Sequence, residues 1–85
     1  MIEVYTLPDC SHCQEAKNYL KEKGISFLEI NLKKKENREA RIFWRSLGIY
    51  KVPVIVLKTD DKISVLKDYS KEKLEEWLKR HGEIQ

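Results

Sequence analysis

Two cysteines, the only two in the chain, stand three positions apart in the segment LPDCSHCQEAK. Ser11 and His12 separate Cys10 from Cys13. Thiols at this spacing can form a redox-active pair, bind a metal ion or form a structural disulfide. The structural role is disfavoured, because the entropic stabilisation from a disulfide grows with loop length and this loop is very short. The redox and metal alternatives have to be weighed against the elements that position the two thiols.

The cysteines follow a predicted strand and open a predicted helix. Residues 2–7 (IEVYTL) are rich in β-branched and aromatic side chains, which is typical of a strand. Over residues 11–23 apolar side chains recur at helical spacing, and Gly24 provides a C-terminal stop. Cys10 is therefore expected at the junction of strand and helix, with Cys13 one turn further along.

A thiol at the start of a helix is well placed to act as a nucleophile. The first backbone N–H groups are unpaired and the helix dipole is positive there, so the thiolate of Cys10 is stabilised. Cys13 lies inside the helix on the same face, and it is expected to stay protonated as the resolving thiol. We assign redox tuning to His12 and Ser11; for His12, simple surface exposure in the first turn is an equally good interpretation.

The remaining segments alternate in a pattern typical of an α/β fold. Further strands are predicted over residues 25–32, 52–58 and 62–67, and further helices over residues 36–47 and from about residue 70. The segment 25–32 is apolar enough to be buried on both sides. The order βαβαββα predicts a four-stranded mixed sheet with helices on both faces. No repeat or linker interrupts the chain, so residues 1–85 are expected to form one domain.

The composition argues against several classes of function. Apolar residues make up 41% of the chain and charged residues 36%, which predicts a soluble globular protein rather than a disordered one. A formal net charge of +3 is mild for a nucleic-acid-binding protein. No apolar run approaches the ~20 residues of a membrane span, and Met1 leads directly into a strand rather than a signal peptide. A cytoplasmic monomer without nucleic-acid or membrane partners is expected.

These segments together resemble the glutaredoxin family of the thioredoxin superfamily. The residues that carry the resemblance are VYTLPDCSHC followed by EAK, then KGISFLEINL, and VPVI after LGIYK. A Cys-x-x-Cys motif after a strand and at the head of a helix, with Val-Pro opening a later strand, is a specific combination. The resemblance implies a thioredoxin-like fold. It also implies a thiol–disulfide oxidoreductase that reduces protein disulfides or glutathione mixed disulfides, with Cys10 and Cys13 as its catalytic residues.

The resemblance also implies a substrate site around Pro53. In this family that proline is cis and faces the dithiol, and the backbone of Val52 pairs with an extended substrate. Lys51 is predicted to lie at the rim of the site, where it would attract an anionic substrate or thiolate. Tyr50 and Asp9 are candidates for shaping the same rim.

The chain departs from the glutathione-using members of the family in three places. It reads Cys-Ser-His-Cys instead of Cys-Pro-Tyr-Cys, it has Leu7 where a lysine is common, and the segment SVLKDYS contains no glycine pair. Asp68 and Ser70 stay candidates for contacting a glutathione carboxylate. The electron donor is therefore expected to be either glutathione or a thioredoxin-reductase-like flavoprotein, and no bound cofactor is expected.

Metal binding is the alternative from another class of function. Cys10, His12 and Cys13 are all competent ligands, but a structural zinc site usually needs four and the other histidine, His81, lies near the far end. The resemblance adds a second form of this alternative, an iron–sulfur cluster bridged between two chains through Cys10, as in some glutaredoxin relatives. Lys17 matches a lysine usual in the family, and a solvated lysine explains it equally well. The sequence leaves the substrate, the electron donor and the direction of electron flow open.

Overall fold

The computed structural model describes residues 1–84. Along the chain it contains β1 (Ile2–Thr6), α1 (Ser11–Glu22), β2 (Phe27–Asn31), the short 3-10 helix η1 (Lys35–Asn37), α2 (Arg38–Ser46), β3 (Val54–Lys58), β4 (Ile63–Leu66) and α3 (Lys71–Arg80). The strands form one sheet in the order β2-β1-β3-β4. β1 pairs with β2 in parallel, while β1–β3 and β3–β4 are antiparallel. The predicted α/β class, βαβαββα order and mixed sheet are confirmed.

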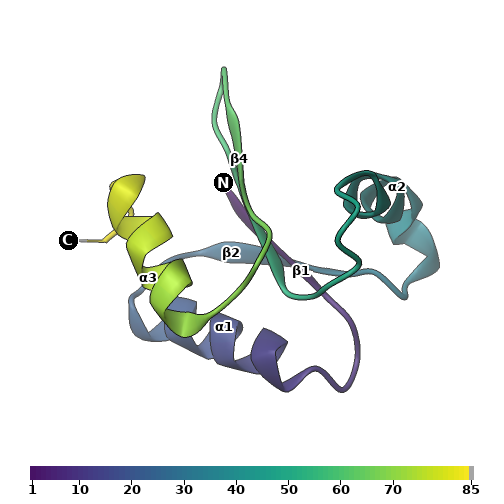
Figure 1. Cartoon of the computed structure of the whole chain (residues 1–85), viewed down its shortest axis with the longest axis horizontal. Coiled ribbons are helices and arrows are strands. Elements are labelled where there is room, and N and C mark those ends of the chain that lie inside the picture. Colours follow the sequence, from purple (N-terminus) through teal and green to yellow (C-terminus); the bar gives the residue numbers. More distant parts are fainter. Residues whose placement is uncertain (85) are drawn as a thin grey trace.

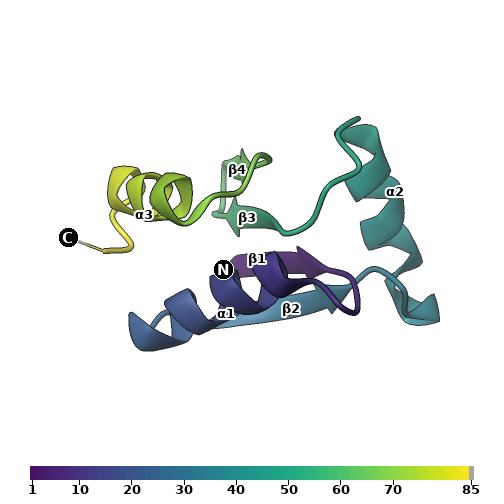
Figure 2. The same cartoon turned by 60° about the horizontal axis from the view of Figure 1, so that its bottom comes forward.

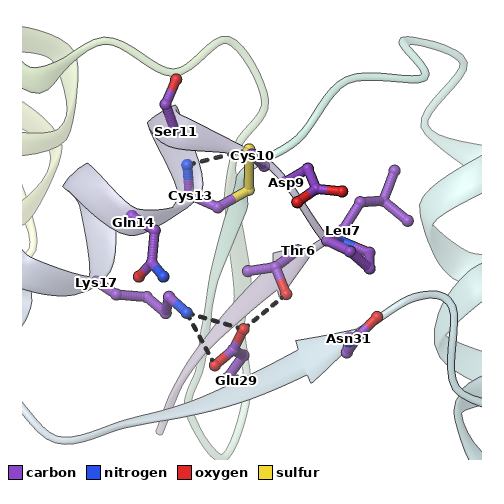
Figure 3. A pocket seen from close by; sticks show the side chains of 11 residues that line it. Thr6, Leu7, Asp9, Cys10, Ser11, Cys13, Gln14, Lys17, Glu29 and Asn31 are labelled. Atoms are coloured by element: carbon purple, nitrogen blue, oxygen red, sulfur yellow. Dashed lines mark hydrogen bonds and ion pairs between the residues drawn. A yellow bond between two sulfur atoms is a disulfide. The ribbon is translucent and has the colours of Figure 1, made fainter.

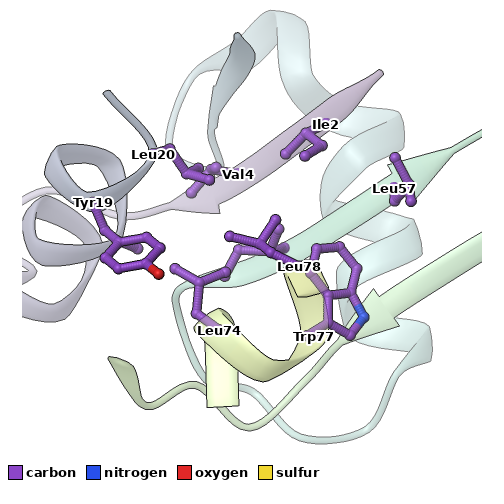
Figure 4. Packing of buried hydrophobic residues seen from close by; sticks show 10 residues of the cluster. Ile2, Val4, Tyr19, Leu20, Leu57, Leu74, Trp77 and Leu78 are labelled. Carbon is purple, nitrogen blue, oxygen red and sulfur yellow. The ribbon is translucent and has the colours of Figure 1, made fainter. Parts of the chain in front are cut away.

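The helices cover both faces of the sheet (Figures 1 and 2). Helices α1 and α3 cover one face and form the α1/α3 cluster with the alternate side chains of β1 and β3. Figure 4 shows this cluster, in which Leu74 and Leu78 of α3 point toward α1 and the sheet, while Trp77 lies on the side of Leu57. The buried members of the cluster are Ile2, Val4, Ala16, Tyr19, Leu20, Ile55, Leu57, Leu74, Trp77 and Leu78. Trp77 is therefore part of the core.

Helix α2 covers the opposite face with a smaller cluster. The buried side chains there come from the strands and from the residue after β2: Tyr5, Ile30, Leu32, Val54 and Val56. Phe43 packs on Tyr5, with ring centroids 5.8 Å apart. Phe43 and Trp44 pack against this cluster but are only half-buried. α2 is a short helix with no fully buried residue. Its apolar side chains contact the sheet on one side and solvent on the other.

The predicted burial of residues 25–32 on both sides is wrong. β2 lies at the edge of the sheet and, among the strands that the structure describes, pairs with β1 alone. Its side chains are covered only where a helix happens to lie over them, so Ile30 is buried while Leu28 is 51% exposed. The apolar run indicated a strand correctly but did not indicate its place in the sheet.

Several predicted boundaries shift by one or two residues. α1 ends at Glu22 and is followed by Gly24, whose φ of +70° fits the predicted left-handed stop. β3 begins at Val54, so Val52 and Pro53 lie in the preceding loop instead of in the predicted strand 52–58.

Within residues 1–84, no helix is both long and apolar enough to cross a bilayer.

Candidate active site

Cys10 and Cys13 form a disulfide at the N-terminus of α1, with their Cα atoms 5.2 Å apart (Figure 3). Cys10 is the N-cap residue, with an extended backbone (φ −108°, ψ 105°). Its Sγ accepts a hydrogen bond from the backbone N–H of Cys13 at 3.1 Å. In the reduced protein the same N–H is positioned to donate to the Cys10 thiolate, and a hydrogen bond to the charged form stabilises that form.

The two sulfurs differ in their exposure to solvent. Cys13 is 2% exposed and lies beneath the first turn of α1, whereas Cys10 is half-buried at the surface. An incoming sulfur atom therefore reaches Cys10 first. Cys13 is shielded from external oxidants and lies one helical turn from its only cysteine partner. This asymmetry matches the nucleophile and resolving roles that the spacing predicts.

The loop between β1 and α1 holds Cys10 at the helix start. Asp9, directly before it, has a φ of +60°, in the left-handed region that aspartate tolerates better than most residues. The only other non-glycine residue with positive φ in the described chain, residues 1–84, is Tyr50, at +51°. Tyr50 lies three residues before Pro53, so the two left-handed residues mark the two loops that carry predicted site residues. Left-handed backbone at non-glycine positions is frequent at functional sites.

The second loop carries the predicted substrate-binding residues. The Val52–Pro53 peptide bond is cis, as the resemblance implied, and Pro53 is buried while Val52 is half-buried. Within residues 1–84, the backbone N–H and C=O of Val52 form no hydrogen bond. Val52 therefore offers an unpaired backbone donor and acceptor next to the sheet.

The loop before Pro53 is fixed by side chains from two other elements. Trp44 of α2 donates from its indole Nε1 to the carbonyl oxygen of Lys51 at 2.8 Å, and its ring meets Tyr50 edge-on with centroids 5.8 Å apart. The ammonium of Lys51 pairs with Asp68 at 3.9 Å, and Lys73 also donates to Asp68, at 2.8 Å. The hydrogen bond from Lys73 and the two lysine charges lower the pKa of Asp68. Lys51 is exposed, and its ammonium already forms an ion pair with the Asp68 carboxylate.

His12 and Ser11 are both exposed in the first turn of α1. Figure 3 shows the Ser11 side chain directed away from Lys17 and Glu29. His12 contacts Tyr69, with ring centroids 5.9 Å apart. In the part of the chain that the structure describes, neither side chain forms a hydrogen bond with the Cys10 sulfur. Tyr69 was missed by the sequence reasoning, because its contact with His12 joins residues 57 positions apart and leaves no local signal.

A polar cavity of about 490 Å³ opens beside the disulfide (Figure 3). It is lined by Thr6, Leu7, Pro8, Asp9, Cys10, Ser11, Cys13, Gln14, Lys17, Glu29 and Asn31. At its floor Lys17 donates to both carboxylate oxygens of Glu29 at 3.1 Å, and the Thr6 hydroxyl donates to the same carboxylate at 2.9 Å. Burial alone would raise the pKa of Glu29, but these hydrogen bonds and the lysine charges lower it below its ordinary value.

The pairing gives Lys17 a partner that sequence reasoning did not find. Lys17 lies four residues after Cys13 and therefore on the same helix face. Glu29 is the one charged residue of an otherwise mostly apolar strand, which is the signal that could have identified it. The parallel pairing of β1 with β2 places Thr6 opposite Asn31 and Glu29 opposite Val4. Thr6, Glu29 and Asn31 therefore lie close together where the two strands end.

The ligands considered for a metal ion do not converge. Among residues 1–84, no group of three or more histidine, cysteine, aspartate or glutamate side chains is arranged to hold a metal. His12 lies against Tyr69, and His81 lies against Trp77 with ring centroids 5.0 Å apart. No finding therefore favours the carrier alternative.

Comparison with known proteins points in one direction. Residues 2–62 match the sequence model of the family described as Glutaredoxin. The N-acetyl-S-hydroxy-L-cysteine reductase of Bacillus subtilis (strain 168) is 32% identical over 83 residues, which cover 98% of this chain and 88% of that protein.

Two solved structures extend the comparison to the fold. The thioredoxin-like protein BC3987 superposes with a TM-score of 0.68 at 30% identity, covering 89% of this chain and 97% of that one. The glutaredoxin-like NrdH-redoxin of Escherichia coli gives a TM-score of 0.59 at 28% identity, covering 74% of this chain and 78% of that one.

Proposed function

Because this chain belongs to the glutaredoxin family, we propose that it is a thiol–disulfide oxidoreductase that works by dithiol exchange between Cys10 and Cys13. The observation that carries the proposal is the hydrogen bond from the Cys13 N–H to Sγ of Cys10, at the N-cap of α1, with Cys13 itself buried. This geometry favours a thiolate at the accessible Cys10 sulfur and leaves the buried Cys13 sulfur available for the resolving step.

The exchange proceeds in two balanced steps. The Cys10 thiolate attacks one sulfur of a substrate disulfide, which forms a Cys10–substrate disulfide and releases the other substrate sulfur as a thiolate that takes up a proton. Cys13 then loses its proton and attacks Sγ of Cys10, which releases the remaining substrate thiolate. The product is the Cys10–Cys13 disulfide. Two electrons and two protons from a donor restore the dithiol.

We assign substrate positioning to the loop around Pro53. The unpaired backbone N–H and C=O of Val52 suit an extended substrate segment that adds to the site as a short strand. Pro53 is buried, and its cis peptide bond fixes the direction of the chain after Val52. Lys51 is proposed to attract an anionic substrate group, for which it would have to give up its ion pair with Asp68. His12 and Ser11, in the first turn of α1, are assigned a tuning role on the stability of the dithiol.

The substrate class extends beyond protein disulfides and glutathionylated thiols. The B. subtilis relative is named as the reductase of N-acetyl-S-hydroxy-L-cysteine, a small sulfenic acid. The same nucleophile can take such a substrate: Cys10 attacks the sulfur of the S–OH group, forms a mixed disulfide and displaces hydroxide, and Cys13 resolves the mixed disulfide. The polar cavity beside the disulfide has room for a small thiol-derived ligand.

The electron donor is proposed to be a thioredoxin-reductase-like flavoprotein, with glutathione as the second candidate. The segment before α3 has no glycine, and Asp68 in this segment is already bonded to Lys73. The related NrdH-redoxin of E. coli is described as a glutaredoxin-like protein with a thioredoxin-like activity profile. A monomer in the cytoplasm, where the thiol pool is kept reducing, suits this cycle.

The test compares two cysteine variants with the intact protein. Cys10→Ser is expected to abolish reduction of insulin disulfides, of a glutathione mixed disulfide and of a small sulfenic acid. Cys13→Ser is expected to accumulate the mixed disulfide with Cys10, visible by mass spectrometry. The wild-type assay is run with glutathione plus its reductase and, separately, with thioredoxin reductase. Turnover retained by Cys10→Ser in every assay would refute the assignment.

A further inference from the structure

We propose that Tyr69 is a positioning residue for the dithiol, because it fixes both His12 and Glu15 of α1 from the loop before α3. The proposal rests on the proposed function and deepens it: Tyr69 sets the redox potential by holding His12 in the first turn of the helix that Cys10 caps. It adds to the site a residue from a distant part of the chain.

Two contacts join Tyr69 to the start of α1. Its ring lies against the imidazole of His12, with centroids 5.9 Å apart and planes inclined at 56°. Its hydroxyl donates to Oε1 of Glu15 at 2.6 Å. His12 lies between the two cysteines, and Glu15 lies two residues after the second. One side chain therefore contacts two polar residues of α1 that lie close to the dithiol in sequence.

Tyr69 is itself held in place. Its ring is half-buried and packs against the α1/α3 cluster. The next residue, Ser70, caps α3 by accepting the N–H of Lys73 at 3.1 Å, and the preceding residue, Asp68, accepts the ammonium of Lys73 at 2.8 Å. The loop is thus anchored on both sides of Tyr69, and the tyrosine can act as a fixed support rather than as a mobile side chain.

The contacts have a direct chemical consequence for the dithiol. The contact with Tyr69 holds the His12 imidazole in the first turn of α1, the helix that Cys10 caps. A hydrogen-bond donor or a positive charge held next to Cys10 stabilises its thiolate and with it the reduced form, which makes the dithiol a stronger oxidant. Burial, followed by the hydrogen bond to Glu15, raises the pKa of Tyr69, so its hydroxyl remains a donor at neutral pH.

The experiment measures the dithiol–disulfide equilibrium against a dithiothreitol redox buffer. Tyr69→Leu is expected to shift the equilibrium constant two- to fivefold toward the disulfide, about 10–20 mV at roughly 30 mV per tenfold change. Tyr69→Phe keeps the ring against His12 and is expected to shift it less than twofold. Tyr19→Phe is the matched control, because the Tyr19 hydroxyl of α1 also donates to a glutamate, Glu75 of α3, at 3.2 Å, but Tyr19 makes no contact with His12. It is expected to leave the equilibrium unchanged.

A double-mutant cycle with His12→Ala separates positioning from a general structural effect. If Tyr69 acts through His12, Tyr69→Leu has no further effect on the equilibrium in the His12→Ala background. An unchanged equilibrium in Tyr69→Leu, or an equal shift with and without His12, overturns the inference. The equilibrium is measurable whether or not the protein turns over a substrate, so failure of this inference is distinct from failure of the proposed function.

Discussion

The indole Nε1 of Trp44 donates a 2.8 Å hydrogen bond to the carbonyl oxygen of Lys51, so a residue of α2 supports the loop that carries Val52 and Pro53. Trp44 is half-buried, and its ring also supports Tyr50. The α2 helix therefore supports the loop that is proposed to position the substrate. This hydrogen bond links the position of the Val52 backbone, where an extended substrate is proposed to pair, to the packing of α2 on the sheet face opposite α1 and α3.

Trp44→Phe tests this support. The substitution keeps an aromatic ring on the sheet but removes the hydrogen bond to Lys51, so the loop holding Val52 is expected to be less well ordered. One hydrogen bond contributes about 0.5–1.5 kcal/mol, which predicts a roughly two- to tenfold increase in KM for a disulfide substrate with a smaller change in kcat. Steady-state kinetics measure it. Trp77→Phe, in the α1/α3 cluster, is the control for loss of an indole; equal kinetics in both variants would argue against a support role for Trp44.

The capped sulfur predicts a second measurable property. The reduced protein is expected to show thiolate absorbance with a midpoint well below ~8.5, the value of a free cysteine, because the Cys13 N–H and the start of α1 stabilise the anion at Cys10. Ultraviolet absorbance is followed across a pH titration. Cys10→Ser should remove the low transition and Cys13→Ser should retain it. A low transition that disappears with Cys13 instead would reverse the two roles.

The features predicted correctly from the sequence are those encoded locally. The strand before Cys10, the helix after it and the Gly24 stop all depend on neighbouring residues, and the cis bond at Pro53 followed from the family motif. The edge position of β2 was not predicted, because an apolar run reports burial without reporting which strands lie beside it. The contacts of Tyr69 were not predicted for the same reason: a side chain that acts across 57 residues has no signature in sequence spacing.

The Lys17–Glu29 pair predicts a change in acid stability. Hydrogen bonds from Lys17 and Thr6 hold the pKa of Glu29 below its unfolded value, so this pair stabilises the fold above that value and the contribution is lost as pH falls through the folded pKa. Glu29 is 40% exposed, so the effect is expected to be small, about 0.2–1 kcal/mol. Glu29→Gln should lower the free energy of unfolding at neutral pH. The difference in this free energy between the variant and wild type should become smaller in acid. Denaturant unfolding at several pH values measures it.

Glu76→Gln is the control for that experiment, because Glu76 forms an exposed ion pair with Arg80 at 3.1 Å on α3, away from the cavity. A loss of stability for Glu29→Gln that is the same at every pH would contradict the electrostatic account and would point to packing of the side chain instead.

Tyr5 predicts the behaviour of the fold in alkali. It is 3% exposed, and burial, followed by the charge of Glu3 and a 3.2 Å hydrogen bond to it, raises the pKa of Tyr5 to about 12. Because the folded pKa lies above the unfolded value of about 10, this group stabilises the fold fully below pH ~10 and loses that contribution as pH rises toward ~12. A shift of this size corresponds to roughly 2–3 kcal/mol lost across that window.

Tyr5→Phe keeps the ring that contacts Phe43 and removes the ionisable hydroxyl, while Glu3 retains Lys58 as a partner at 3.2 Å. The variant is expected to lose at most ~1 kcal/mol at neutral pH, the range of one hydrogen bond, and to decline less steeply than wild type in alkali. Burial also raises the pKa values of Tyr19 and Tyr69, so some alkaline decline should persist in the variant. The test is to measure the free energy of unfolding of both proteins between pH ~8 and ~11.5. If the two curves run parallel over this range, the Tyr5 hydroxyl does not resist ionisation in the folded protein and the prediction is wrong.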